Sequence, residues 1–367
     1  KFLAQVVVAL GAASRLFQAS RFAMAYRIFG SENSPYSVKV RSYFRYKGIP
    51  HDWIPRTGEA MKEFNRFAKL QIVPLVVSPD GKAMQDSTPI IEAFEAQFPE
   101  PFIHPPGPLL RFLSELLEEF GDEWGNKWMF HLRWAREVDQ DVVSLRLARE
   151  LMPGLPEEQV RGMAASIKGR MTGRGFAVGS NDRTALIIES DLCAFLVLLE
   201  RHLAARPFLF GGRPSLGDLG LGPQLYETLI DPTGGELMRP YPLASAWCRH
   251  MVDFAAEPAV PASGGNAFEP WAALAPTLEP LLRRAGLFLR WSVANARAIE
   301  SGAKEMEVEL DGKIWWQTVG GPQKYQAKSL RELQRKYQAV ASDAPLADIL
   351  ARTGCLQFLH ETPAAKL

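Results

Sequence analysis

The chain has 367 residues, of which 47% are hydrophobic and 23% charged, and its formal net charge is +1 at pH 7. This length allows two or three domains, and the composition is that of a soluble globular protein. A net charge this small argues against bulk electrostatic attraction to nucleic acid or to an anionic membrane. We therefore expect no nucleic acid as a partner, and we expect no membrane span.

Three cysteines, Cys193, Cys248 and Cys355, stand far apart in the sequence. Their spacing is not that of a metal site, and their odd number does not suggest a disulfide framework. We expect no metal and a reducing compartment, which predicts a cytoplasmic location.

Residues 1–24 differ in composition from the rest of the chain. The apolar run Phe2–Ala13 is shorter than the about 20 residues that a helix needs to cross a bilayer. The absence of acidic residues here is typical of a transit peptide or of a poor secretory signal. The alternative, which we favour, is an upstream extension that is poorly anchored, with Met24 as the real start.

The stretch from Tyr26 to Gly48 predicts a strand followed by a helix. Tyr26–Phe29 is rich in β-forming residues, and Pro35 suits the first turn of a helix. Ser34 is then the N-cap, next to unpaired backbone N–H groups and the positive end of the helix dipole. Taken alone, Ser34 is most simply a helix cap.

The next elements complete a small mixed domain. His51–Pro55 predicts a second strand and Ile72–Val77 a third, and a hairpin turn at Pro79–Lys82 leads to a short return strand. A helix capped by Asp86 or Ser87 follows. The predicted order is βαβ, then a β-hairpin, then α.

This order, together with three motifs, resembles the thioredoxin-like N-terminal domain of the cytosolic glutathione S-transferases. The motifs are Ser34–Tyr36, Val73–Pro74 with its family cis peptide bond, and Asp86–Ser87. The Ser-Pro-aromatic start is similar to the plant tau class and to related bacterial enzymes. The resemblance covers residues 26–254 and implies an all-helical second domain.

The resemblance implies that Ser34 is the catalytic residue. A thiol has a pKa near about 8.5, and its thiolate is the nucleophile. A hydroxyl that donates to the glutathione sulfur, backed by a helix N-terminus, would favour the thiolate. Asn33 precedes Ser34 and could be the partner of the thiol in its place.

The remaining glutathione contacts are also carried over from the family. Val73, before Pro74, would pair its backbone with the cysteine of the tripeptide, and Ser87 and Asp86 would hold the γ-glutamyl end. Tyr36 completes the serine motif.

One position departs from the tau-like pattern. Ile72 stands where a basic or amide residue is common, so Gln71 is the candidate for the glycyl carboxylate.

The implied activity is that of a glutathione transferase with glutathione as co-substrate and a small hydrophobic electrophile as partner. Conjugation, ether cleavage and peroxide reduction remain open, and the family implies detoxification and a homodimer. The competing class is a non-catalytic binding protein with the same fold. A dithiol oxidoreductase is disfavoured because residues 1–192 contain no cysteine.

The helical region holds two features of note. Trp124, Trp128 and His131 lie on an aromatic stripe that is either core or the wall of an apolar substrate pocket. Ser215 and Asp218 form a capping box, which is a folding device rather than a catalytic pair.

The last part of the chain, which follows a linker predicted at 257–265 from its prolines and glycines, lies beyond the family pattern. It predicts helices over 278–301, 324–340 and 346–359, and a hairpin that turns at Asp311–Gly312. Since a lone hairpin is marginal, we expect this extension to pack on the body of the protein.

The predicted fold class is α+β. The predicted divisions are listed in chain order: an extension (1–24), a thioredoxin-like domain (25–103), a helical domain (104–255) and a mixed helix and β-hairpin extension (256–367).

Overall fold

The protein is described by a computed structural model that covers residues 25–254, 265 and 267–360. The predicted N-terminal extension, 1–24, lies outside these residues. Within the described part of the chain, no helix combines the length and the apolar character that a membrane crossing requires.

The chain divides into two compact units. The first contains residues 25–102 and 150–153, and the second contains 103–149 and the described residues from 154 onward. The first has the thioredoxin-like mixed sheet, and the second is helical with an added hairpin region, so the predicted α+β fold class is confirmed. The exact domain boundaries remain a prediction.

The first unit is built on a four-stranded sheet in the order β2-β1-β3-β4. Strands β1 and β2 are parallel, whereas β1 with β3 and β3 with β4 are antiparallel. In chain order its elements are β1 (Tyr26–Gly30), α2 (Pro35–Lys47), β2 (His51–Pro55), α3 (Gly58–Phe67), β3 (Leu75–Val77), β4 (Ala83–Gln85) and α4 (Ser87–Gln97). Helix α3 interrupts the predicted order between β2 and β3.

Successive residues of β1 face opposite sides of the sheet. On one side, Tyr26 packs against Phe44 of α2 and Phe94 of α4, with ring centroids 5.8 and 4.9 Å apart. On the other side, Phe29 forms a buried cluster with Phe64 of α3. The sheet is therefore covered by α2 and α4 on one face and by α3 on the other.

The second unit begins with a continuous helical stretch that contains one turn of π-helix. Its elements up to the linker are α5 (Pro108–Phe120), the π-turn η1 (Gly121–Gly125), α6 (Asn126–Ala135), α7 (Glu137–Leu151, whose end belongs to the first unit), α8 (Glu157–Thr172), the 3₁₀ turn η2 (Gly175–Ala177), α9 (Ala185–Leu203), α10 (Leu216–Leu229), α11 (Pro232–Met238) and α12 (Pro242–Val252). At Gly121, an added Cβ would come within 2.6 Å of the α10 backbone, so only glycine fits this crossing.

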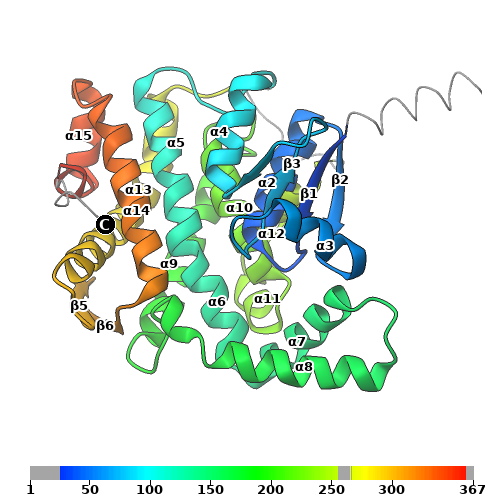
Figure 1. The fold of residues 1–367 in the computed structure, drawn as a ribbon. Helices are drawn as coiled ribbons and strands as arrows, with labels where there is room; N and C mark the ends of the chain where they lie inside the picture. Colours follow the sequence, from blue (N-terminus) through cyan, green and yellow to red (C-terminus); the bar gives the residue numbers. More distant parts are fainter. Residues whose placement is uncertain (1–24, 255–264, 266, 361–367) are drawn as a thin grey trace, which may run out of the picture. The chain divides into compact units, whose positions relative to one another are not determined.

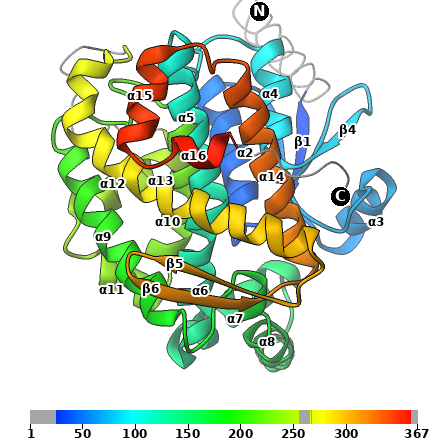
Figure 2. The same ribbon diagram turned by 90° about the vertical axis from the view of Figure 1, so that its left-hand side faces the viewer.

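The residues after the linker pack directly on this helical body. They form α13 (Trp271–Glu300), β5 (Glu305–Leu310), β6 (Lys313–Thr318), α14 (Gly321–Gln338), α15 (Ala344–Arg352) and α16 (Leu356–Leu359). Helix α14 runs alongside α5, where Phe112 and Tyr337 have ring centroids 5.5 Å apart (Figure 1). The β5–β6 hairpin lies against α13 (Figure 2).

The predicted capping box at the start of α10 is present. The buried Asp218 carboxylate accepts from Ser215 N and Leu209 N at 2.9 Å, from Ser215 Oγ at 2.6 Å and from Trp247 Nε1 at 3.1 Å. Four donors on three segments thus converge on one carboxylate. Burial raises the pKa of Asp218 to about 6, against the opposing effect of these hydrogen bonds.

We predict that Asp218→Ala lowers the free energy of unfolding by about 3 kcal/mol or more, because it leaves several buried donors without an acceptor. Urea denaturation followed by circular dichroism measures this change. The matched control is Asp182→Ala, at an exposed loop position, which should change stability by less than about 0.5 kcal/mol. Equal effects of the two substitutions would contradict the role of Asp218.

Candidate functional site

The Ser34 hydroxyl lies at the N-terminus of α2. Ser34 is the N-cap, with an extended backbone (φ −113°, ψ 110°), and its Oγ accepts from Ser37 N at 3.4 Å. Pro35 follows in the first turn, as predicted. For the hydroxyl hydrogen, the described residues supply no acceptor. Ser34 can therefore donate to a group that approaches the positive end of the helix.

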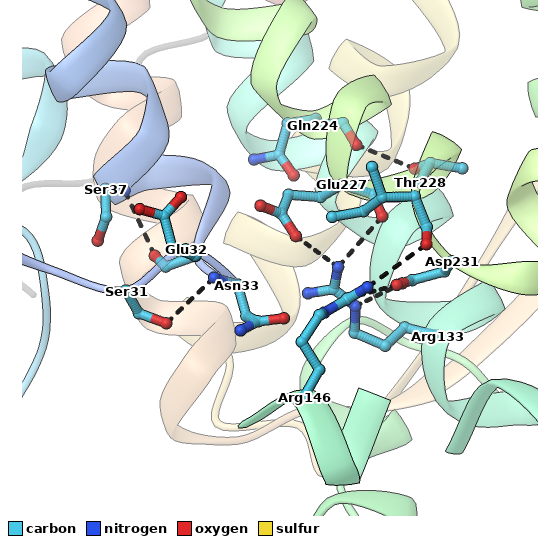
Figure 3. A network of polar contacts seen from close by, with 12 residues as sticks. Ser31, Glu32, Asn33, Ser37, Arg133, Arg146, Gln224, Glu227, Thr228 and Asp231 are labelled. Carbon is cyan, nitrogen blue, oxygen red and sulfur yellow. Dashed lines mark hydrogen bonds and ion pairs between the residues drawn. The ribbon is translucent and has the colours of Figure 1, made fainter. Parts of the chain in front are cut away.

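The loop before Ser34 is held by hydrogen bonds within the first unit. Ser31 accepts from Asn33 N through its Oγ at 3.2 Å (Figure 3) and from Ser34 N through its carbonyl at 3.1 Å. The Glu150 carboxylate accepts from Ser31 Oγ at 2.8 Å, and from Glu32 N and Asn33 Nδ2 at 2.6 Å each. Since Glu150 engages the Asn33 amide, the geometry favours Ser34 over Asn33 as the donor to a bound thiol.

The Val73–Pro74 peptide bond is cis, as the motif predicts. The β3 ladder starts at Leu75, so the half-buried Val73 lies just outside the paired part of the sheet. Ile72 and Gln71 precede it and are exposed. An extended ligand that runs past Val73 would continue the backbone pairing of the sheet beyond the start of β3.

Gln85 is a residue of this region that the sequence reasoning missed. Its Oε1 accepts from Lys69 N and Leu70 N at 2.8 and 3.0 Å, and its Nε2 donates to Leu70 O and Ile72 O at 2.8 and 2.9 Å. One side chain thus ties the loop before Val73 to the end of β4. The signal available in the sequence was its place directly before Asp86 and Ser87.

Asp86 and Ser87 stand at the start of α4. Asp86 is the N-cap, with φ 82°, and its side chain makes no capping hydrogen bond. Non-glycine residues rarely adopt this backbone conformation, and such strain concentrates at functional sites. Ser87 is buried in the first turn, and Tyr36 of α2 is half-buried. Through Gln85, the structure brings the Val73 loop and Asp86–Ser87 together.

The second unit holds the three residues of the predicted substrate pocket. Trp124 and Trp128 are only 2% and 1% exposed. Their Nε1 groups both donate to Asp191 Oδ2, at 2.7 and 2.8 Å, and Arg284 pairs with the other oxygen of this carboxylate. These are core contacts that join η1 and α6 to α9 and α13. A role in substrate binding stays a prediction.

His131 is also buried, but its contacts are separate from those of the two tryptophans. Its Nδ1 lies 2.7 Å from Ser180 Oγ, and its Nε2 lies 3.0 Å from Glu189 Oε1. The structure therefore links Trp124 with Trp128 through Asp191. His131 belongs to a separate hydrogen-bond network, with Ser180 and Glu189.

A buried charge cluster lies between α6, α7 and α10 (Figure 3). Arg133 donates to Asp231 Oδ2 and Glu227 Oε2 at 2.6 Å each, and Arg146 pairs with the other oxygen of Asp231. Burial raises the pKa of Glu227 to about 7, against the attraction of Arg133. Gln224, one turn earlier, has no hydrogen-bond partner for its side-chain amide among the described residues. The sequence reasoning missed this cluster because its members come from three helices and from the N-cap of α11.

Within the described residues, no three side chains of His, Cys, Asp or Glu come together in a way that could hold a metal ion.

Comparison with known proteins gives matches to two family models. Residues 28–102 match the N-terminal domain of glutathione S-transferases, and residues 191–250 match the C-terminal domain. A search of curated proteins returns no match.

Solved structures give further similarities. A glutathione S-transferase from Methylobacterium radiotolerans JCM 2831, in complex with glutathione sulfonate, is 19% identical, with 63% of this chain and 92% of that chain covered and a TM-score of 0.38. One from Methylobacillus flagellatus KT, with glutathione bound, is 18% identical, with 63% and 96% covered and a TM-score of 0.39. Maleylacetoacetate isomerase from Anaeromyxobacter dehalogenans 2CP-1 is 23% identical, with 63% and 85% covered and a TM-score of 0.33.

Lys127 is buried in a cage of three tryptophans next to the predicted pocket residues. Its Nζ lies 3.5 Å from the ring centroid of Trp291, and 5.7 and 5.8 Å from those of Trp124 and Trp315. Burial lowers the pKa of Lys127 to about 7, from an ordinary value near 10.5, while Glu123 acts in the opposite direction. Two of the three rings come from the residues after the linker.

We predict that Lys127 makes stability rise with pH above neutrality. Between pH 7 and 9 the unfolded chain holds a proton on this amine that the folded chain has released, so raising the pH favours folding. The stability of the wild type relative to Lys127→Met should increase by about 1 to 3 kcal/mol over this range. Urea denaturation at each pH measures it.

The matched control is Lys324→Met, at an exposed position of α14. Its stability should follow the wild type across the same pH range. If the free energy of unfolding changed with pH to the same extent in the wild type and in Lys127→Met, the prediction would be contradicted.

Proposed function

Since the chain belongs to the glutathione S-transferase superfamily, we propose that it is a glutathione transferase in which Ser34 stabilises the glutathione thiolate. The observation that carries the proposal is the Ser34 hydroxyl at the N-cap of α2, with its hydrogen unengaged by the described residues. A hydrogen bond from this hydroxyl and the positive end of the helix both favour negative charge on a bound sulfur.

The size of the required effect is modest. Lowering a thiol pKa by two units, enough to make most of the bound glutathione a thiolate near pH 7, corresponds to about 2.7 kcal/mol. One charge-assisted hydrogen bond and a helix terminus together supply a free energy of this order. Ser34 acts as a donor in this scheme, and the thiolate is the nucleophile.

The rest of the proposed glutathione site follows the sequence motifs. Val73, beside the cis bond to Pro74, would pair its backbone with the cysteine of the tripeptide. Ser87 and the N-terminus of α4 would bind the γ-glutamyl carboxylate, and Asp86 its ammonium group. Gln71 would face the glycyl end, and Tyr36 would flank the tripeptide.

The second substrate is proposed to be a small hydrophobic electrophile, with conjugation as the reaction and Trp124, Trp128 and His131 near its site. A homodimer in the cytoplasm and a role in detoxification are proposed from the family.

The proposal is tested by the rate of glutathione conjugation with an aryl halide. Ser34→Ala should lower kcat/KM by about 100-fold, since it removes the donor to the thiolate. Asn33→Ala should cost less than Ser34→Ala, because the Asn33 amide is already engaged by Glu150.

The control for this test is Ser78→Ala, a hydroxyl in the β3–β4 turn of the same unit, which should keep the wild-type rate. Unchanged conjugation in Ser34→Ala would overturn the proposed mechanism. A wild type that is not retained on immobilised glutathione would instead support a non-catalytic binding protein.

A second prediction concerns the loop held by Gln85. Gln85→Ala removes four hydrogen bonds to the segment before Val73, so the KM for glutathione should rise about 10-fold while kcat changes less. Steady-state kinetics with glutathione as the varied substrate measures this. Gln97→Ala, at an exposed position of α4, is the control, and an equal effect of both variants would refute the assignment.

A further inference from the structure

Three side chains of the second unit form a chain of hydrogen bonds from a hydroxyl through an imidazole to a carboxylate. Ser180 Oγ lies 2.7 Å from His131 Nδ1, and His131 Nε2 lies 3.0 Å from Glu189 Oε1. His131 comes from α6 and Glu189 from α9, while Ser180 closes the loop after η2. None of the three takes part in the proposed glutathione contacts of the first unit, and His131 alone is shared with the residues proposed to lie near the electrophile.

The protons in this chain have one consistent arrangement. Burial lowers the pKa of His131 below its ordinary 6.5, so the imidazole is neutral at pH 7 and carries a single N–H. Although burial opposes it, hydrogen bonds from His131 and Arg136 lower the pKa of Glu189, which is therefore ionised and only accepts. The N–H must then be on Nε2, and Nδ1 accepts from the Ser180 hydroxyl.

The same chain is held in place from both ends. Arg136 Nη2 donates to Glu189 Oε1 at 2.6 Å, and the Ser180 backbone N–H donates to Gly175 O at 2.9 Å. His131 is 3% exposed, whereas Ser180 is half-buried. The base is thus shielded from water, whereas the residue that carries the hydroxyl is only half-buried.

A hydroxyl within hydrogen-bond reach of a base, with the base oriented by a third group, is the geometric signature of an activated nucleophile. We propose that Ser180, His131 and Glu189 form a second catalytic site, which hydrolyses small activated esters without glutathione. The alternative is a purely structural role, in which the three side chains only anchor the loop of residues 173–182 on α6 and α9.

The proposed reaction is acyl transfer to Ser180 followed by hydrolysis. Ser180 Oγ attacks the ester carbonyl carbon while its proton moves to His131 Nδ1, and Glu189 stabilises the imidazolium. The imidazolium then protonates the departing alcohol oxygen as the C–O bond breaks. Water attacks the acyl-serine with His131 as base, which releases the carboxylic acid and restores the serine.

The test is hydrolysis of p-nitrophenyl acetate by the full chain in the absence of glutathione. Ser180→Ala and His131→Gln should each lower kcat/KM by at least about 100-fold, and the wild-type profile should rise with pH through a midpoint below 6.5. Ser190→Ala, an exposed hydroxyl of α9, is the matched control and should keep the wild-type rate.

A second measurement does not depend on the variants folding. A fluorophosphonate probe should attach to wild-type Ser180, as located by peptide mass spectrometry, since only an activated serine reacts readily. Hydrolysis at the buffer rate, hydrolysis unchanged in Ser180→Ala, or the lack of a label on Ser180 would each overturn the proposal and leave the anchoring network.

Discussion

The first turn of α2 is the constraint on which the account of the first unit depends. A helix N-terminus leaves backbone N–H groups without helical acceptors and carries a partial positive charge. Ser34 satisfies one of these groups with its oxygen and keeps its own hydrogen for another partner. The same atom therefore stabilises the helix and offers a donor at a place that favours an anion.

Buried charges organise the second unit in a comparable way. The Asp218 carboxylate accepts hydrogen bonds from four donors at the start of α10. The Asp191 carboxylate accepts from two indole N–H groups and forms an ion pair with Arg284. Each carboxylate joins segments that are far apart in the chain, and removal of either would leave several buried donors unpaired. The Lys127 cage adds Trp291 of α13 and Trp315 of β6, so these two elements contribute to the interior of this unit.

Local signals in the sequence were sufficient for much of the first unit. The Ser34–Pro35 cap of the first unit and the Ser215–Asp218 capping box of the second are set by a few neighbouring residues, and the structure has both. The cis Val73–Pro74 bond was expected only from the family resemblance, and it is also present. Helix α3 was not predicted. The π-turn at 121–125 could not be predicted either, because the helical sequence pattern continues on both sides of it.

The local sequence pattern could not predict contacts between residues that are far apart in the chain. Nothing in the sequence pairs Lys127 with Trp291 and Trp315, or His131 with Ser180 and Glu189, because these pairs depend on how helices pack. Similarly, Gln85 became visible as a positioning residue only when its four hydrogen bonds were known.

The central claim is that Ser34 lowers the pKa of the bound glutathione thiol, and the ultraviolet absorbance of the thiolate measures this directly. Titration of the wild-type complex should give a thiol pKa about two units below that of free glutathione, and the Ser34→Ala complex should return most of the way to the free value. Equal thiol pKa values in the two complexes would contradict the account.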